Sequence, residues 1–416
     1  MLAPFDLVIR NTSVVLAAVD PSLNAIPRGA IGIQGGKVAY LGAEAGLPPG
    51  AVTPATRVVD AKGGFAGPGF VDPHTHLVFA GDRGGEFEMR CRGASYLDIA
   101  QAGGGIMNTV RATRAASEDA LVEGARPRLA RLLAQGVTTA EVKSGYGLDL
   151  ANELKLLRAI RRLGQSQPVR LVPTLLCAHA VPAEFRDDRA GYVRLCLREI
   201  LPAVASAGLA VACDAFCEQG AFTVEETRSL LSAAQSLSLR VKLHADQLSA
   251  QGGAALAAAL GALSADHLEF VDARGAAALA EAGTSAVLVP TTTLFLRQRG
   301  FAPGRMLKDA GVNVALGTNV NPGSAMSESV GLTLGLGCLE NGLSPAEAYW
   351  GMTRGAALAL GLEEEGQLRV GGPADCVVFS CADPRHLPYH LAVNHAAVVV
   401  KSGQVAVDSP LAFCAG

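Results

Sequence analysis

Eight short apolar runs alternate with amphipathic helical segments through the middle of the chain, at about positions 67–362. Segments such as ELKLLRAIRRL and VEETRSLLSAAQSL, which follow these runs, have the apolar spacing of a helix packed on one face. Apolar runs that alternate with helices indicate βα units and a parallel sheet. Eight such units is the number that closes a barrel, so the pattern predicts an α/β fold with a (β/α)8 TIM-type barrel.

Nearly every apolar run ends in a residue with a polar side chain. These residues are His74, His76, Lys143, His179, Glu218, His244, His267 and Asn319. In a barrel the carboxyl ends of all strands meet at one face, where active sites lie. A lone histidine is more often a packed residue held by a hydrogen bond. Five of the chain's eight histidines at successive strand ends instead favour one shared site.

The two ends of the chain have a different sequence pattern from the middle. Residues 1–66 and 363–416 contain short β-type runs broken by glycine, proline and asparagine, which indicate a small antiparallel sheet. Neither end is long enough to make a stable sheet alone. We therefore predict that the two ends together build one small β-sandwich beside a barrel domain at 67–362.

Composition and charge exclude several classes of function. Half of the 416 residues are hydrophobic and the formal net charge is −3, which favours a large core over disorder. The chain has no long basic run, so we expect no nucleic-acid or anionic-membrane partner. No apolar stretch reaches the ~18 residues of a membrane helix, and the first residues do not resemble a signal peptide. The nine cysteines form no CxxC pair, as expected of reduced thiols in a cytoplasmic protein.

His74 and His76 are two residues apart on a predicted strand, so their side chains point to the same face. Two imidazoles at one strand end are suited to chelating a divalent ion. We expect one metal ion per chain, either Zn²⁺ or iron (Fe²⁺/Fe³⁺), because neutral imidazole nitrogens accept both. Such an ion activates water and polarises a carbonyl, which is the chemistry that hydrolyses amides, cyclic amides, amidines and esters.

Several motifs resemble a known family. GFVDPHTHLVFAGDR resembles the opening of the amidohydrolase superfamily, and the narrower motifs EVKSGYGL and AQAGGGI resemble the imidazolonepropionases. LCAHAVP, CDAFCEQGAF, KLHADQLS, ADHLEF and NPGS extend this resemblance over the whole barrel. It implies that water opens the ring of 4-imidazolone-5-propanoate to give N-formimidoyl-L-glutamate in histidine degradation. It also implies one metal ion per chain and a homodimer.

The resemblance assigns roles to particular residues. Its metal ligands fall on His74, His76, His244 and Asn319. Its substrate-binding residues fall on Arg83, Tyr146, His179, Gln247, Asn321, Gly323 and Ser324. Its catalytic positions, including the histidine beside the attacked carbonyl, fall on His267, Gln247 and Asn319.

Residue chemistry agrees with several of these roles. The planar guanidinium of Arg83 is suited to binding a carboxylate through two N–H donors. A surface ion pair is the alternative interpretation of this arginine. The glycines that flank Tyr146 permit a tight loop, and the turn that begins at Asn321 offers amide and hydroxyl donors.

Other polar residues at the strand ends are expected to support the site. In binuclear amidohydrolases a carbamylated lysine bridges two metals, and Lys143 is the candidate for that role here. The resemblance here is to a mononuclear group, so we expect Lys143 to make a supporting hydrogen bond. We expect Glu141 and Glu218 to orient ligands, and Cys217 to be buried rather than reactive.

Asn319 departs from the family pattern. The family's last strand reads GTDFNPG, whereas this chain reads GTNVNPG, so asparagine replaces the metal-binding aspartate. An amide ligates weakly through oxygen and cannot accept a proton usefully. Three explanations remain open: a natural variant with another base such as His267, an inactive relative, or a deliberate substitution. Our hypothesis is that this protein keeps the fold, the metal site and the ligand pocket of the family but turns over its substrate slowly.

Two other classes of function remain. A hydantoinase or dihydroorotase would carry two metals and a carbamylated Lys143, whereas an aromatic deaminase would release ammonia. A catalytically inactive binding protein would hold the ligand without converting it.

Overall fold

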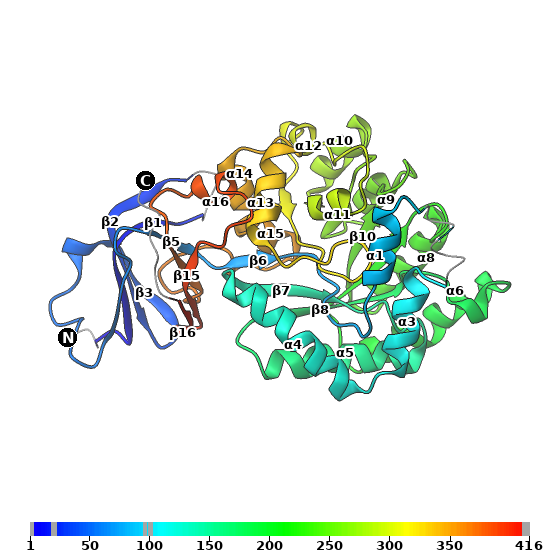
Figure 1. The fold of residues 1–416 in the computed structure, drawn as a ribbon, viewed down its shortest axis with the longest axis horizontal. Coiled ribbons are helices and arrows are strands. Elements are labelled where there is room, and N and C mark those ends of the chain that lie inside the picture. The colour runs from blue at the N-terminus through cyan, green and yellow to red at the C-terminus, as the bar shows by residue number, and fades with distance from the viewer. Residues whose placement is uncertain (1–3, 18–22, 95–97, 99–102, 410–416) are drawn as a thin grey trace.

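The computed structural model describes residues 4–17, 23–94, 98 and 103–409. Figure 1 shows a barrel with a smaller sheet at one end. Part of the glycine-rich motif near position 100, and Cys414, lie outside the described residues. No helix in the described ranges is both long enough and apolar enough to cross a membrane.

The barrel strands follow one another in chain order, and every neighbouring pair from β6 to β13 that forms a ladder is parallel. The strands are β6 (Phe70–Asp72), β7 (Val137–Lys143), β8 (Arg170–Ala178), β9 (Ala212–Cys217), β10 (Arg240–Ala245), β11 (Ser264–His267), β12 (Ser285–Leu288) and β13 (Val314–Leu316). Each lies within one of the eight predicted apolar runs. The prediction of a (β/α)8 barrel is therefore confirmed.

The seam between the last and first barrel strands closes through backbone bonds beyond the strand ends. The Asn319 N–H donates to the carbonyl of His74 at 2.9 Å, and the His76 N–H donates to the carbonyl of Val320 at 3.0 Å. The Thr318 hydroxyl also donates to Asp72 at 2.5 Å. The same bonds that close the barrel therefore bring Asn319 beside the two histidines.

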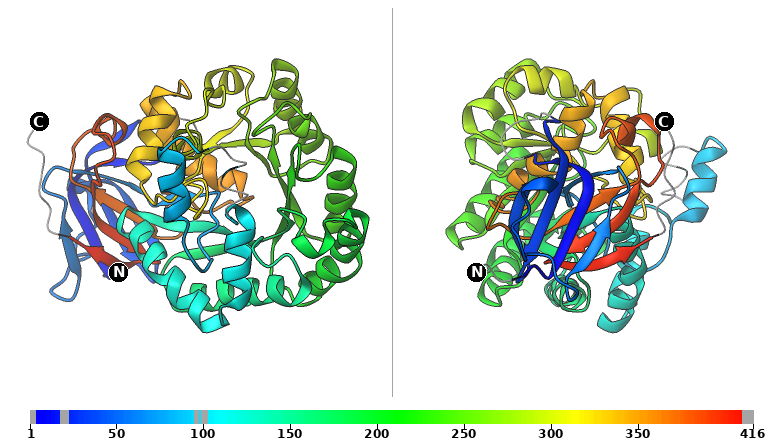
Figure 2. Two further views of the ribbon diagram at one scale, coloured as in Figure 1. Left: turned by 45° about the vertical axis from the view of Figure 1, so that its right-hand side comes forward. Right: turned by 90° about the vertical axis from the view of Figure 1, so that its left-hand side faces the viewer.

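Helices surround the barrel strands, as Figure 2 shows in its left view. In the first half of the barrel they are α1 (Gly84–Cys91), α3 (Ile106–Ala115), α4 (Glu118–Ala134), α5 (Leu150–Gln165), α6 (Arg189–Leu195), α7 (Leu201–Ser206) and α8 (Val224–Ser236). In the second half they are α9 (Gly253–Ala259), α10 (Ala273–Ala282), α11 (Pro290–Phe295), α12 (Gly304–Asp309), α13 (Val330–Leu339), α14 (Pro345–Gly351) and α15 (Arg354–Ala359). The short helix α16 (His386–Tyr389) precedes the last two strands of the chain.

Local sequence explains where these helices begin. The Thr223 hydroxyl accepts from the Glu226 N–H, and the Glu226 carboxylate accepts from the Thr223 N–H, which is a capping box for α8. Asp149 caps α5 in the simpler way, by accepting from the N–H of Asn152 at 2.8 Å. Helix α5 then turns apolar residues such as Leu156 and Leu163 into the core.

The smaller sheet contains strands from both ends of the chain, as predicted, and they lie side by side in the right view of Figure 2. Its order is β16-β15-β14-β5-β1-β2-β3, with β4 paired to β1. The N-terminal strands are β1 (Leu7–Val15), β2 (Ala25–Gln34), β3 (Lys37–Ala43), β4 (Arg57–Asp60) and β5 (Phe65–Pro68). The C-terminal strands are β14 (Cys376–Phe379), β15 (Ala396–Lys401) and β16 (Gln404–Asp408).

This sheet is mixed, so the expectation of a purely antiparallel sheet is wrong. Strand β1 pairs in parallel with β4 along one half and with β5 along the other. Parallel pairing needs a connection that returns the chain to its starting end. The segment between β3 and β4, which contains the short turn Glu44–Gly46, provides that return.

The two largest hydrophobic clusters lie in the two parts of the molecule. One lies within the small sheet and includes Ile31, Ile33 and Val378. The other fills the barrel and reaches the sheet through stacked rings, with Phe65 and Phe379 centroids 4.4 Å apart. Strand β5 spans positions 65–68 and therefore runs across the predicted boundary between 66 and 67. The division into 1–66, 67–362 and 363–416 stays a prediction.

Candidate metal centre and catalytic site

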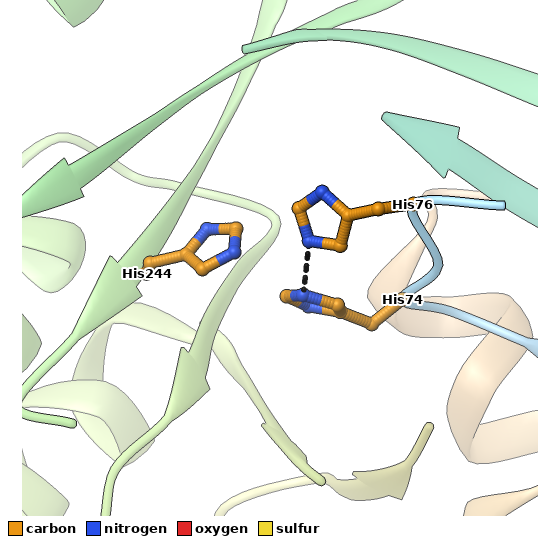
Figure 3. A group of neighbouring side chains, drawn as sticks. All are labelled: His74, His76 and His244. Atoms are coloured by element: carbon orange, nitrogen blue, oxygen red, sulfur yellow. Dashed lines mark hydrogen bonds between the residues drawn. The ribbon is translucent and has the colours of Figure 1, made fainter. Parts of the chain in front are cut away.

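Three buried imidazoles meet at the carboxyl end of the barrel. Figure 3 shows His74 and His76, which follow β6, facing His244 on β10. The ring centroids are 5.2 Å apart for His74 and His76, 4.6 Å for His74 and His244, and 5.5 Å for His76 and His244. One nitrogen from each ring lies within 4.8 Å of the other two. The three side chains predicted as imidazole ligands are therefore brought together.

Backbone pairing with β7 explains why both histidines face inward. The side chain of Thr75 lies on the other side of the chain and donates to the carbonyl of Glu141 at 2.5 Å. The N–H of Lys143 donates to the carbonyl of Thr75 at 2.9 Å. Because side chains alternate along an extended chain, His74 and His76 both point into the barrel.

Buried aspartates hold the second nitrogens of two of these rings. Nδ1 of His74 lies 2.6 Å from Asp266, and Nδ1 of His244 lies 2.9 Å from Asp214. Each contact leaves Nε2 facing the centre of the cluster, which is the usual arrangement of a metal-binding histidine.

The imidazole cluster fits a metal ion. Nε2 of His74 and Nε2 of His76 lie 3.2 Å apart, so the two ring edges face each other. Burial lowers the pKa of both rings well below the ordinary value, which favours the neutral form that binds metals. A divalent ion would satisfy both facing nitrogens at once.

Two buried lysines lie beneath the imidazoles. Nζ of Lys143 is 2.7 Å from Asp214 and 2.8 Å from Glu141. Nζ of Lys242 is 2.9 Å from Glu141, and it also donates to the carbonyl of Pro73 at 2.8 Å. Burial opposes the charge of Lys143, but the carboxylates outweigh that effect and hold its pKa above the ordinary value. Lys143 is therefore an ammonium that neutralises these acids.

These ammonium groups bear on the number of metal ions. A second group with metal-like spacing contains His74, Glu141 and Asp266. Its carboxylates already face Lys143 and Lys242, both of which lie 3.5 Å from Asp266. A carbamate on Lys143 would place another negative charge among these acids. The arrangement therefore fits one ion at the three imidazoles and not a binuclear site.

Asn319, the predicted fourth metal ligand, lies beside His74 in the seam. Its side-chain amide donates to the hydroxyl of Thr292 at 2.8 Å, and its oxygen accepts from Asn321 at 3.2 Å. Its backbone is left-handed, with φ of 51°. Asparagine and aspartate tolerate that conformation better than other side chains.

Strained backbone recurs at another strand end of the site. His267 has a φ of 82°, which is costly for a residue with a side chain and is typical of functional positions. Its ring centroid lies 5.4 Å from His74 and 5.2 Å from His244. His267 therefore lies beside His74 and His244.

His179 and Tyr146 cover the other side of His76. The rings of His179 and His76 are stacked, with centroids 5.2 Å apart. Nδ1 of His179 lies 3.0 Å from the carbonyl of Gly145, so the ring carries its proton there and Nε2 is an acceptor. Burial lowers the pKa of His179 to about 3 and raises that of Tyr146. Both rings are therefore neutral near pH 7.

Arg83 and the turn that begins at Asn321 lie together. Arg83 precedes α1, and its Nε donates to Glu86 at 2.8 Å. A side-chain carbon at Gly323 would overlap Nη1 of Arg83, so a larger residue there would force the guanidinium to shift. The N–H groups of Gly323 and Ser324 both donate to Oδ1 of Asn321 at 2.8 Å. Since these amides are engaged, the Arg83 guanidinium is the stronger candidate for an anion.

Gln247 is buried in the loop after β10, which Glu218 holds in place. Oε2 of Glu218 accepts from the N–H groups of Gln247 at 3.1 Å and Leu248 at 2.8 Å. Glu141 contacts the two buried lysines, as described above. The expectation that Glu141 and Glu218 orient the metal ligands stays a prediction. Cys217 is buried as predicted, and burial raises the pKa of its thiol to about 11.

Asp214 and Asp266 are the residues that sequence reasoning missed. Each is an acid inside an apolar strand run, in VACDAFC and in LSADH. A buried acid requires a partner, because an unpaired charge is costly in the core. The need for such a partner could have identified both aspartates from the sequence as residues that support a metal ligand.

We predict that Asp214→Asn weakens metal binding by about 10–100-fold, because His244 loses the carboxylate that orients its ring. Competition with a chromophoric chelator measures the dissociation constant. Asp272→Asn is the matched control, since Asp272 only caps α10 and asparagine caps equally well. Equal metal affinity in the Asp214 variant and the control would contradict this role.

The chain is similar to known hydrolases. A sequence model of the amidohydrolase family matches residues 94–407. Solved structures of a triazine hydrolase variant and of a zinc-bound adenosine deaminase from Xanthomonas campestris have TM-scores of 0.74 and 0.71. Each is 20% identical; the alignments cover 97% and 99% of this chain and 95% of each of the two proteins. These structures support the fold alone.

Two sequence relatives are much closer. An imidazolonepropionase from Myxococcus xanthus is 63% identical, with 99% of both chains covered. An imidazolonepropionase from Anaeromyxobacter dehalogenans is 51% identical, with 98% of this chain and 97% of the relative covered. These alignments cover both the barrel and the small sheet. The chain therefore belongs to the imidazolonepropionases of the amidohydrolase family.

Proposed function

We propose that the protein uses water to open the ring of 4-imidazolone-5-propanoate, giving N-formimidoyl-L-glutamate, a step of histidine degradation. The proposal rests on the buried cluster of His74, His76 and His244. Arg83 lies beside Gly323, in the turn that follows the last barrel strand. An imidazole cluster suits hydrolysis of a cyclic amide, and a guanidinium suits the substrate's carboxylate. The names of the two imidazolonepropionases reported above support the same reaction.

We assign one divalent ion, Zn²⁺ or iron, to His74, His76 and His244, with Asn319 at the fourth position. When bound, the ion activates water and polarises the carbonyl. His267 lies beside the imidazoles with its buried Nδ1 3.7 Å from Glu269, and its ring can bond the carbonyl oxygen as charge develops there. His179 offers its Nε2 as an acceptor for a ring N–H.

Arg83 binds the propionate arm in this proposal. Nε and Nη2 of Arg83 lie 2.8 Å and 2.7 Å from Glu86, so Glu86 fixes the guanidinium plane. Nη1 lies on the side of Gly323 and is the donor left for a substrate carboxylate. Tyr146 and His179 narrow the space next to His76 and exclude water from the ring.

A binding protein without turnover is the second candidate, and Asn319 is the observation that favours it. The amide leaves the position next to His74 without a basic oxygen. Tight binding of the product without conversion of the substrate would support this candidate.

We also propose a homodimer located in the cytoplasm. Sedimentation velocity and cell fractionation test these two points.

Arg83→Lys is expected to raise KM by about 10–100-fold, with a smaller change in kcat. A lysine ammonium cannot reproduce the guanidinium's simultaneous hydrogen bonds to Glu86 and to a substrate carboxylate. Loss of imidazolone absorbance and formation of formimidoylglutamate measure turnover. Arg92→Lys is the matched control, since Arg92 is an exposed partner of Glu88 at the end of α1. Ammonia release, or an unchanged KM in the Arg83 variant, would contradict the proposed substrate.

A further inference from the structure

Three of the eight histidines take no part in the barrel site. His386, His390 and His395 all lie within one stretch of ten residues, HLPYHLAVNH. His386 begins α16, His390 immediately follows it, and His395 immediately precedes β15. The fold therefore gathers every remaining imidazole of the chain at one place, far along the sequence from the catalytic residues.

Two of the three rings, those of His390 and His395, are close in space, and His386 lies one helical turn from His390. The His390 N–H donates to the carbonyl of His386 at 2.9 Å, so these residues are one helical turn apart. Residues four apart on a helix are neighbours on one face. The ring centroids of His390 and His395 lie 5.1 Å apart. That separation falls within the 4.6–5.5 Å found among the imidazoles of the barrel site.

His395 has an unused nitrogen in a buried setting. His395 is only 4% exposed, and its Nδ1 lies 3.2 Å from the Ser380 hydroxyl. Nε2 is buried and has no hydrogen-bond partner among the described residues. Burial, followed by the nearby His390 and His386, lowers the pKa of His395. The ring is therefore a neutral base, and an unpaired buried polar atom is costly unless a ligand satisfies it.

The surrounding chemistry favours a transition metal. His386 and His390 are exposed, and neither forms an ion pair with an acid of the described residues. Asp383, the acid nearest in sequence, is engaged by Arg385 at 2.9 Å. The available donors are therefore imidazole nitrogens, which select ions such as Zn²⁺, Ni²⁺ or Cu²⁺ over Mg²⁺ or Ca²⁺.

We propose that His386, His390 and His395 form a second metal site, separate from the barrel, that binds one divalent transition-metal ion. His395 provides the fixed ligand. In this structure the ligand nitrogens of the three rings do not all lie within 4.8 Å of one another. The exposed rings of His386 and His390 therefore turn about their side-chain torsions to complete the coordination, since exposed side chains change rotamer readily. This proposal does not depend on the reaction proposed for the barrel.

An ion at this site would tie α16 to β15 across the surface of the barrel. The loop between them packs on α13, where Gly331 leaves room for the carbonyl of Val393 and Gly335 leaves room for Leu391. Asn394 also donates to the carbonyl of Ala134 at the end of α4 at 2.9 Å. The ion would therefore stabilise the junction between the barrel and the small sheet.

Titration of the metal-free full chain with Zn²⁺ tests the proposal, with chelator competition and calorimetry as readouts. We expect two equivalents in the wild-type protein. His390→Ala and His386→Ala should each lose the weaker equivalent and keep the tighter one, because both side chains are exposed and distant from catalysis. His76→Ala should do the reverse. In protein already holding one equivalent, further Zn²⁺ should raise Tm for the wild type and not for the His390 variant.

Two outcomes would overturn the site. One is a single equivalent of Zn²⁺ in the wild-type chain. The other is a second equivalent that persists in both the His386 and the His390 variants, since it would then be bound elsewhere. Circular dichroism of each variant confirms that loss of an equivalent is not loss of the fold.

Discussion

Asn319→Asp is expected to raise kcat/KM by about 10²–10⁴-fold, the range that a positioned general base contributes. The new carboxylate would stand next to His74 in the seam and accept the proton of the attacking water. The substitution should not disturb the fold, because Asp tolerates the φ of 51° as well as Asn does. The Thr292 hydroxyl, which now accepts from Asn319 at 2.8 Å, can turn and donate instead.

Steady-state assays of ring opening by both metal-loaded proteins measure this effect. Asn321→Asp is the control, because it adds the same charge two residues away and should gain nothing. The metal content of each protein must be compared, since a carboxylate also binds the ion more tightly than an amide. Equal and fast turnover by the wild type and the Asp variant would contradict the hypothesis and point to another base, such as His267.

Lys143→Met is expected to lower the free energy of unfolding by about 3–5 kcal/mol, the cost of removing one partner from a buried ion pair. The Lys143 side chain is fully buried and lies within 3.5 Å of Glu141, Asp214 and Asp266. Methionine fills similar space but leaves Lys242 as the only ammonium near these acids. Urea unfolding measures the change. The imidazoles that Asp214 and Asp266 orient should also bind metal less tightly.

Arg158→Met is the matched control for this loss. Arg158 pairs with Glu118 on the surface at 2.9 Å, and its side chain is 48% exposed. Such a pair contributes less than about 1 kcal/mol. If Lys143→Met costs no more than this control, the buried acids must be stabilised by other groups. The interpretation of Lys143 as their counter-ion would then fail.

Patterns within short stretches of sequence determined much of this protein. The eight apolar runs predicted the eight barrel strands, because burial of a parallel strand on both faces leaves a local signature. The His-x-His spacing placed His74 and His76 on one face, since side-chain alternation is also a local property. The same reasoning identified His244 and His267, because both end a buried run.

Tertiary structure alone decided how distant segments meet. The parallel pairing of β1 with β4 and β5 depends on the path of a connection, which local patterns do not specify. The contacts of Asp214 with His244 and of Asp266 with His74 join different strands of the barrel. Asn319 was visible as an anomaly in the sequence, but its place beside His74 follows from closure of the barrel. Such contacts arise from long-range packing, where burial and the cost of an unpaired charge, rather than residue spacing, select the partner.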